Sequence, residues 1–235
     1  MNLLAIDTSN QVLGVALMKD DILVGEFVTN IKKNHSVRLM PAIDQLMRET
    51  DMTPDMLDKI AVAKGPGSFT GVRIGLATAK AMAWALDIPV TGVSSLEVLA
   101  YQGRFSNRLI CPFFDARRAN VYAGLFQWQG NQLQTVKQEQ NVAMTDWLKP
   151  LAAAQQTVLF LSPDMALYRE KVVEEMGELA VIPDGPYMIA NPSHLALAGL
   201  QKGADNTHAL TPNYLRLAEA EAKWLDAQKD QKTNG

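Results

Sequence analysis

The segment that most constrains the fold runs from Ile60 to Leu86 and reads IAVAKGPGSFTGVRIGLATAKAMAWAL. It begins with a short apolar run and continues through a loop that contains three glycines and a proline. The remainder is rich in alanine, leucine, methionine and lysine, which favour helix. We therefore predict a strand over Ile60–Ala63, a tight loop, and a helix over Val72–Leu86.

Small residues recur along this predicted helix in rows with a spacing of four. One row consists of Gly71, Gly75, Ala79 and Ala83, and the alanines at positions 77, 81 and 85 form a second row. The only charged residues in the helix are Arg73 and Lys80. A helix this apolar on all sides is normally buried on more than one side. Two interpretations stay open: the first row meets a partner subunit, or it packs against the protein's own core.

The glycine loop offers backbone N–H groups at the start of a helix, where anions bind. It lacks the Lys–Ser/Thr pair of a P-loop, because Val72 and Arg73 follow Gly71. Its glycine spacing also differs by one residue from the dinucleotide-binding pattern. An anion site and a plain strand-to-helix turn are therefore both compatible with the loop.

The composition indicates a folded protein that does not bind nucleic acid on its own. Hydrophobic residues make up 48% of the 235 residues, and the net charge is −3, whereas nucleic-acid-binding proteins usually carry a basic face. Cys111 is the only cysteine, which fits a reducing compartment. We find neither a signal peptide nor an apolar run long enough for a membrane helix. We expect a cytoplasmic protein without a membrane segment.

The chain opens with three predicted strands, over Leu3–Ile6, Val12–Met18 and Ile22–Val28, which suit an antiparallel meander. The first strand ends at Asp7, and Thr8 and Ser9 follow. A carboxylate at this place, followed by hydroxyl residues, is similar to the start of actin-like and sugar-kinase-like folds, where it faces nucleotide phosphate and metal. An ordinary Asx-turn explains the same residues equally well.

A helix is predicted over His35–Glu49, with Leu39, Ile43 and Met47 on one face. His35 is the one histidine near candidate chemistry. A helical metal site needs a second histidine four residues further on, and Leu39 stands there instead. The sequence therefore predicts no metal site, and no arrangement of residues in it supports catalysis by itself.

The second half repeats the pattern of the first. An apolar run ends at Asp115, a short polar turn follows, and a further strand begins at Asn120, so that Asp7 and Asp115 occupy matching places. We predict a first lobe over residues 1–104 and a second, smaller lobe over residues 105–211. A C-terminal helix over residues 212–228 is expected to pack back on the first lobe.

Several of these segments closely resemble the TsaB (YeaZ) family. The main one is GPGSFTG, Gly65 to Gly71, followed by Arg73, Ile74 and Gly75. The others are LLAIDTS over residues 3–9, His35-Ser36, Leu39-Met40-Pro41, and Pro212-x-Tyr214-Leu215-Arg216. The resemblance spans most of the chain and is strongest in its first half.

The resemblance implies an α/β, two-lobed actin-like (ASKHA) fold with duplicated mixed-sheet lobes. It implies a non-catalytic paralogue and partner of TsaD, which transfers threonylcarbamoyl to the adenosine beside the tRNA anticodon. TsaE, an ATPase, joins the complex. ATP and a metal are expected in the partner subunits, none is expected to bind tightly to this chain alone, and tRNA is expected to be contacted mainly through the complex. A homodimer is compatible with the chain when it is alone.

The resemblance places the partner interface on two helices near the amino end. Together with the small-residue rows it predicts an interface made of Leu39, Ile43, Met47, Gly71, Arg73, Gly75, Ala79 and Ala83. A weak nucleotide site is predicted at Asp7, Thr8 and Ser9. Two other functions stay open: a stand-alone sugar-kinase-like phosphotransferase that uses ATP, and a peptidase.

Overall fold

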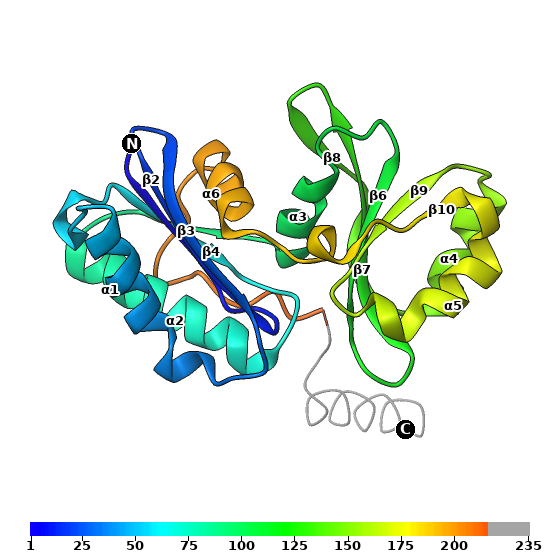
Figure 1. The fold of residues 1–235 in the computed structure, drawn as a ribbon, viewed down its shortest axis with the longest axis horizontal. Coiled ribbons are helices and arrows are strands. Elements are labelled where there is room, and N and C mark those ends of the chain that lie inside the picture. Colours follow the sequence, from blue (N-terminus) through cyan, green and yellow to red (C-terminus); the bar gives the residue numbers. More distant parts are fainter. Residues whose placement is uncertain (216–235) are drawn as a thin grey trace, which may run out of the picture.

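The computed structural model describes residues 1–215 and has two lobes, each built on a five-stranded sheet (Figure 1). The first sheet has the order β3-β2-β1-β4-β5. Its strands are β1 (Leu3–Asp7), β2 (Val12–Lys19), β3 (Ile22–Asn30), β4 (Lys59–Ala63) and β5 (Val90–Val93). The second sheet has the order β10-β9-β6-β7-β8. Its strands are β6 (Leu109–Asp115), β7 (Asn120–Gln129), β8 (Gln132–Ala143), β9 (Val158–Leu161) and β10 (Ala180–Val181).

The two sheets have the same topology. In each, the first three strands form an antiparallel meander, and the last two are added in parallel beside the first strand. Asp7 is the last residue of β1 and Asp115 is the last residue of β6. The prediction of an α/β fold with duplicated mixed-sheet lobes is confirmed.

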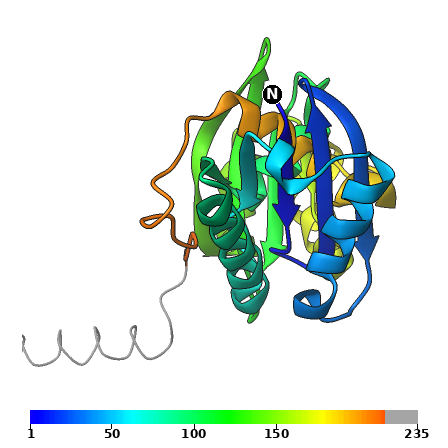
Figure 2. The same cartoon turned by 90° about the vertical axis from the view of Figure 1, so that its left-hand side faces the viewer.

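Three helices cover the first sheet. α1 (Leu39–Glu49) and α2 (Phe69–Leu86) lie side by side on one face (Figures 1 and 2), and their apolar side chains share a core with β1, β2 and β4. α6 (Pro192–Gln201) covers the other face. Every residue of β1 and β4 is buried, as expected for strands that are covered on both faces.

The position of α6 corrects the predicted domain boundaries, which assigned residues 105–211 to the second lobe. Leu195 and Ala198 of α6 pack in the same core as Leu3 and Ala5 of β1. The chain therefore returns to the first lobe after β10. The second face of the first sheet would otherwise expose its apolar side chains, so the returning helix completes the lobe.

The second lobe carries its helices on one face of its sheet. α4 (Met144–Ala153) and α5 (Met165–Met176) pack there, and the core beneath them contains Trp147, Phe113 and Phe160, all fully buried or nearly so. The short α3 (Ser95–Ala100) lies where the lobes meet, because its Leu96 and Leu99 share a core with residues of both sheets.

The helix predicted over 212–228 lies mostly outside the described residues, and residues 212–215 are not helical. Within residues 1–215, none of the helices combines the length and the apolar character needed to cross a membrane.

Candidate functional site

The GPGSFTG loop is shaped to fit the turn between β1 and β2. The backbone N–H of Ser68 donates to the carbonyl of Ser9 over 2.7 Å, and a Cβ atom on Gly67 would collide with the same carbonyl. Gly65 has a φ of 90°, in the region that favours glycine. These contacts support the strand-to-helix-turn interpretation of the loop.

α2 begins at Phe69, three residues before the predicted start. The hydroxyl of Ser68 accepts a hydrogen bond from the N–H of Gly71 over 3.2 Å and caps the helix. At the other end, Asp87 adopts a left-handed conformation with a φ of 54° and stops the helix. This loop and these two ends fix which side of α2 faces the sheet.

The row of Gly71, Gly75, Ala79 and Ala83, which we call the inner row, faces the protein's own core. All four residues are buried, and Ala79 and Ala83 share a core with β1 and β4. A Cβ atom on Gly75 would lie 2.5 Å from the hydroxyl oxygen of Thr8, and that hydroxyl donates to the carbonyl of Gly71 over 2.7 Å. The structure therefore corrects the prediction that the inner row meets a partner: its close approach is to β1.

The same correction applies to α1. Leu39, Ile43 and Met47 are almost fully buried in the core that they share with α2 and the first sheet. The sequence showed that these residues lie on one face of the helix, and that face points inward. The exposed side of α1 carries Met40 and polar residues.

Arg73, the remaining residue of the predicted interface, is exposed on the opposite side of α2. It belongs to a second row with a spacing of four, which we call the outer row: Phe69, Arg73, Ala77, Ala81 and Ala85. Every member of this row is exposed, and the neighbouring Trp84 is 75% exposed. The alanines at 77, 81 and 85 were visible in the sequence as a second row, but the sequence did not predict that Phe69 would extend it or that Trp84 would be exposed beside it.

Asp7, Thr8 and Ser9 do not form an open nucleotide site. All three are buried beneath the start of α2, and Asp7 is only 4% exposed. Its carboxylate accepts hydrogen bonds from the N–H of Ser9 over 2.8 Å and from the hydroxyl of Ser9 over 2.7 Å, as in an Asx-turn. Burial raises the pKa of Asp7 above its ordinary value, although the bonds from Ser9 act in the opposite direction. The prediction of a nucleotide site at these residues is corrected.

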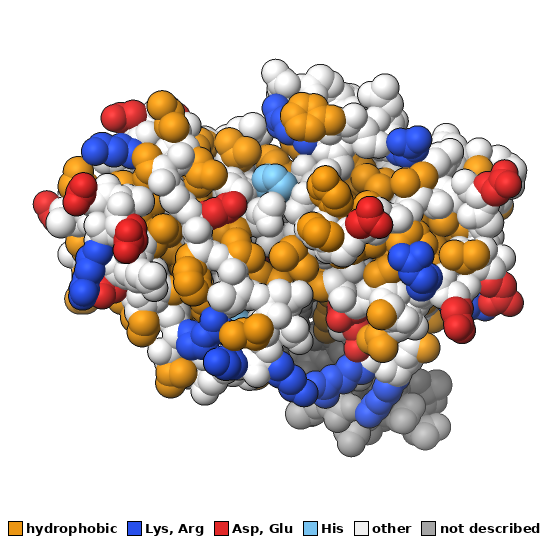
Figure 3. Space-filling view, in the orientation of Figure 1, with side chains coloured by type: hydrophobic (Ala, Val, Ile, Leu, Met, Phe, Trp, Pro, Cys, Tyr) orange, Lys and Arg blue, Asp and Glu red, His pale blue; other side chains and the backbone are white. Residues whose placement is uncertain are grey.

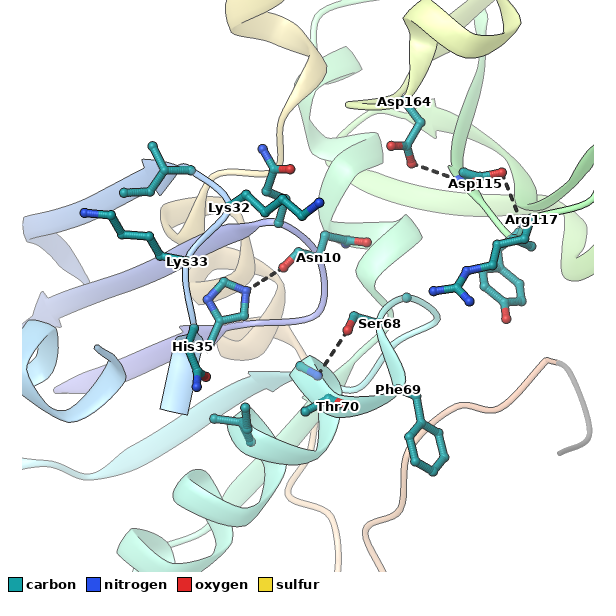
Figure 4. Close-up of a pocket in the computed structure, with 18 residues that line it drawn as sticks. Asn10, Lys32, Lys33, His35, Ser68, Phe69, Thr70, Asp115, Arg117 and Asp164 are labelled. Atoms are coloured by element: carbon teal, nitrogen blue, oxygen red, sulfur yellow. Dashed lines mark hydrogen bonds between the residues drawn. The ribbon is translucent and has the colours of Figure 1, made fainter. Parts of the chain in front are cut away.

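A cavity of about 800 Å³ lies between the lobes next to these residues (Figure 4). The first lobe lines it with the turn at Asn10, the loop through Lys32 and His35, and the start of α2. Asp115, Arg117 and Asp164 line it from the second lobe. Lys and Arg side chains also gather along the lower edge of the molecule, where the lobes face each other (Figure 3).

The acidic groups of the cavity are held by the second lobe itself. Asp164 accepts a hydrogen bond from the N–H of Asp115 over 2.8 Å, and Asp115 accepts one from the hydroxyl of Tyr168 over 2.7 Å. Burial raises the pKa of Asp164 above its ordinary value. Arg117 extends toward the cavity from a turn in which three successive residues, 117–119, have φ between 55° and 66°. The turn therefore places the side chain of Arg117 in the lining of the cavity.

His35 lies at the rim of the cavity, where its Nε2 atom is 2.7 Å from the carbonyl oxygen of Asn10. Over residues 1–215, no group of three or more His, Cys, Asp or Glu side chains has the arrangement of a metal site. The described residues thus offer a mixed-charge cavity, and an exposed helix face beside it.

Comparison with known proteins agrees with this fold. The family model for TsaD, described as a tRNA N6-adenosine threonylcarbamoyltransferase, matches residues 23–224. The tRNA threonylcarbamoyladenosine biosynthesis protein TsaB of Bacillus subtilis (strain 168) is 50% identical over 229 residues, which cover 97% of this chain and 100% of that protein. TsaB of Escherichia coli (strain K12) is 31% identical over 58% of this chain and 62% of its own length.

Among solved structures, YeaZ from Pseudomonas aeruginosa superposes with a TM-score of 0.78 at 29% identity, covering 91% of this chain and 99% of that one. The two-lobed architecture, the GPGSFTG loop and the full-length similarity therefore agree. The chain belongs to the TsaB (YeaZ) family, and the TsaD model also matches most of its length.

Proposed function

We propose that this chain is a non-catalytic subunit that binds TsaD and activates the transfer of threonylcarbamoyl to adenosine in tRNA. The names of its relatives support a role in the biosynthesis of tRNA threonylcarbamoyladenosine. The observation that carries the finer proposal is the outer row of α2, an exposed and largely apolar helix face with the exposed Trp84 beside it.

The similarity to the TsaD model also bears on how the two chains meet. Because the model matches residues 23–224, TsaD and this chain are expected to share the two-lobed fold and the helix pair on its first sheet. Proteins of the same fold that pair through the same face form a pseudo-twofold contact, the commonest arrangement in protein dimers. The exposed sides of α1 and α2 are the faces that this arrangement uses.

The geometry gives less support to the two alternatives. A kinase-like phosphotransferase needs a carboxylate that faces nucleotide and metal, and Asp7 is buried and bonded to Ser9. We therefore propose that ATP and metal bind in the partner subunits, including TsaE, and that this chain alone does not hold ATP tightly.

For a peptidase, the described residues offer no paired metal ligands, and Ser68 is used as a helix cap.

The test is a comparison of three protein mixtures: this chain alone, TsaD alone, and both together. We expect the two chains to co-elute on a sizing column. In the complete reaction mixture with TsaE, we expect modified tRNA to form only when both chains are present. Modified tRNA formed without TsaD would contradict the non-catalytic role, and separate elution with full activity of TsaD would contradict the role of binding subunit.

A further inference from the structure

Arg73 is the only charged side chain in the outer row, and two aromatic rings hold it in place. Its guanidinium carbon lies 3.7 Å from the ring centre of Phe69 and 5.8 Å from that of Tyr214. Its Nε atom donates a hydrogen bond to the hydroxyl of Tyr214 over 2.7 Å. Its two terminal nitrogens have no hydrogen-bond or ion-pair partner among residues 1–215.

The second ring is itself anchored to both lobes. Tyr214 stacks on Phe69 with 5.6 Å between ring centres. Next to it, the N–H of Asn213 donates to the carbonyl of Lys64 over 2.7 Å, and the side-chain amide of Asn213 donates to Glu139 over 2.9 Å. Arg73 is therefore fixed by contacts that reach outside α2, although its guanidinium is exposed.

A guanidinium that is held in this way matches a carboxylate. Its two terminal nitrogens form a planar fork that binds both oxygens of a carboxylate at once. Because the stacking and the bond to Tyr214 already restrict the side chain, less conformational entropy is lost on binding. Arginine is also among the residues that most often dominate the binding energy of an interface.

A second copy of this chain presents no carboxylate on α2 itself; on α1 it offers Asp44, which is already paired with Arg48, and Glu49 at the end of the helix. No Asp or Glu occurs between Phe69 and Leu86. The next residue, Asp87, would lie opposite Arg73 in a symmetric antiparallel pair of α2 helices only if the pair were centred on Lys80. That register brings the two Lys80 residues to the crossing point; each is bonded to the carbonyls of His208 and Leu210 of its own chain, and their like charges repel.

We propose that Arg73 is a specificity-determining residue: it binds a carboxylate on a helix of TsaD and so favours TsaD over a second copy of this chain. The inference rests on the proposed function. We expect the carboxylate of a protein rather than a phosphate of RNA, because the surface next to Arg73 is apolar: Ala77 and Ala81 follow it along the outer row, and Trp84 lies beside them. Such a surface suits an apolar helix with one acidic residue.

The test measures binding of the full-length chain to TsaD and self-association of the chain, with matched arginine variants. Arg73→Met keeps an apolar side chain on Phe69 and removes the fork. We expect it to weaken TsaD binding ~30-fold, the equivalent of ~2 kcal/mol, and to leave self-association unchanged. Arg73→Lys keeps the charge without the fork and should recover only part of the loss. The control is Arg169→Met, an exposed arginine on α5 of the other lobe.

The possible results separate this inference from the proposed function. If the wild-type chain does not bind TsaD, the proposed function fails. If the wild-type chain binds and Arg73→Met binds equally well, only the inference fails. The inference is also overturned if Arg73→Met and Asp87→Asn weaken self-association alike, because Arg73 would then bind Asp87 of a second copy. It is overturned as well if Arg73→Met impairs tRNA binding while TsaD binding stays intact, because Arg73 would then bind RNA.

One more variant tests whether the chain's own C-terminal residues occupy the fork. A chain that ends at Leu215 should keep its TsaD affinity and its sensitivity to Arg73→Met if the carboxylate belongs to TsaD. A truncated chain that binds TsaD more tightly and no longer responds to Arg73→Met would assign the carboxylate to residues 216–235 and overturn the inference. Melting temperatures of all variants show whether each one is folded.

Discussion

The inner and outer rows of α2 have the same spacing and opposite surroundings. Both repeat every four residues; the inner row consists of two glycines and two alanines, and the outer row of Phe69, Arg73 and three alanines. They are offset by two residues, which is about 200° around a helix, so they lie on opposite sides of α2. The inner row touches β1 and the outer row is exposed. Small residues thus serve close packing within the lobe on one side, and on the other side they are exposed.

Glycine distinguishes the two rows. The inner row contains Gly71 and Gly75, and a Cβ atom at either position would collide with Thr8. The outer row contains no glycine: it begins with Phe69 and Arg73, which pack with Tyr214, and continues with three exposed alanines. A glycine inside a helix costs about 1 kcal/mol relative to alanine. It therefore marks the side of closest approach, which is the side that faces the sheet.

The largest expected effect comes from enlarging the inner row. Gly75→Leu forces a side chain into the space next to the hydroxyl of Thr8, and overpacking of this kind costs ~1–3 kcal/mol. For a chain of this size, a loss of ~3 kcal/mol lowers the melting temperature by roughly 6–12 °C. Thermal unfolding of Gly75→Leu next to Ala77→Leu, the matched change on the outer row, measures the difference. Equal melting temperatures for both variants would mean that the two rows are not distinct.

The next effect concerns binding and comes from the outer row. Ala81→Arg places a long charged side chain in the middle of the exposed face, and we expect it to weaken binding to TsaD ~10–100-fold, or ~1.4–2.8 kcal/mol. Its stability should change by no more than ~0.5 kcal/mol, because surface substitutions rarely do more. Ala153→Arg, at an exposed helical position of α4, is the control. Undiminished affinity in a folded Ala81→Arg protein would remove the outer row from the interface.

The sequence predicts the elements of this fold well, because the signals for them are local. The strand over Ile60–Ala63, the glycine loop and the helix that ends at Leu86 are all confirmed. The matching positions of Asp7 and Asp115 indicate the duplication, and the two sheets confirm it. The period of α2 shows that two rows of small residues exist.

The orientation of these elements could not be predicted in the same way. The period of a helix does not say which of its sides faces the sheet, and the contacts that decide this involve Thr8 and Ser9, about 60 residues earlier in the chain. The return of α6 to the first lobe depends on an uncovered sheet face, which no local pattern records. Asp7 stands where nucleotide-binding folds carry a carboxylate, but the start of α2 covers it.

The smallest expected effect lies beneath the inner row, at Asp7. Burial raises the pKa of this carboxyl in the folded protein above the value of 3.8 that applies when the chain is unfolded. The folded state then holds the proton more tightly, so the contribution of Asp7 to stability is most favourable below pH 3.8 and is lost as the pH rises through the raised pKa.

Asp7→Asn keeps an oxygen that can accept the hydrogen bonds from Ser9 and removes the charge. We therefore expect the stability of Asp7→Asn, measured relative to wild type by urea unfolding, to increase with pH above 3.8 and then to level off. Asp55→Asn, at an exposed carboxylate, corrects for the loss of one charge. If the stability difference between Asp7→Asn and wild type is the same at every pH, burial does not raise the pKa of Asp7 in the folded protein, and the prediction fails.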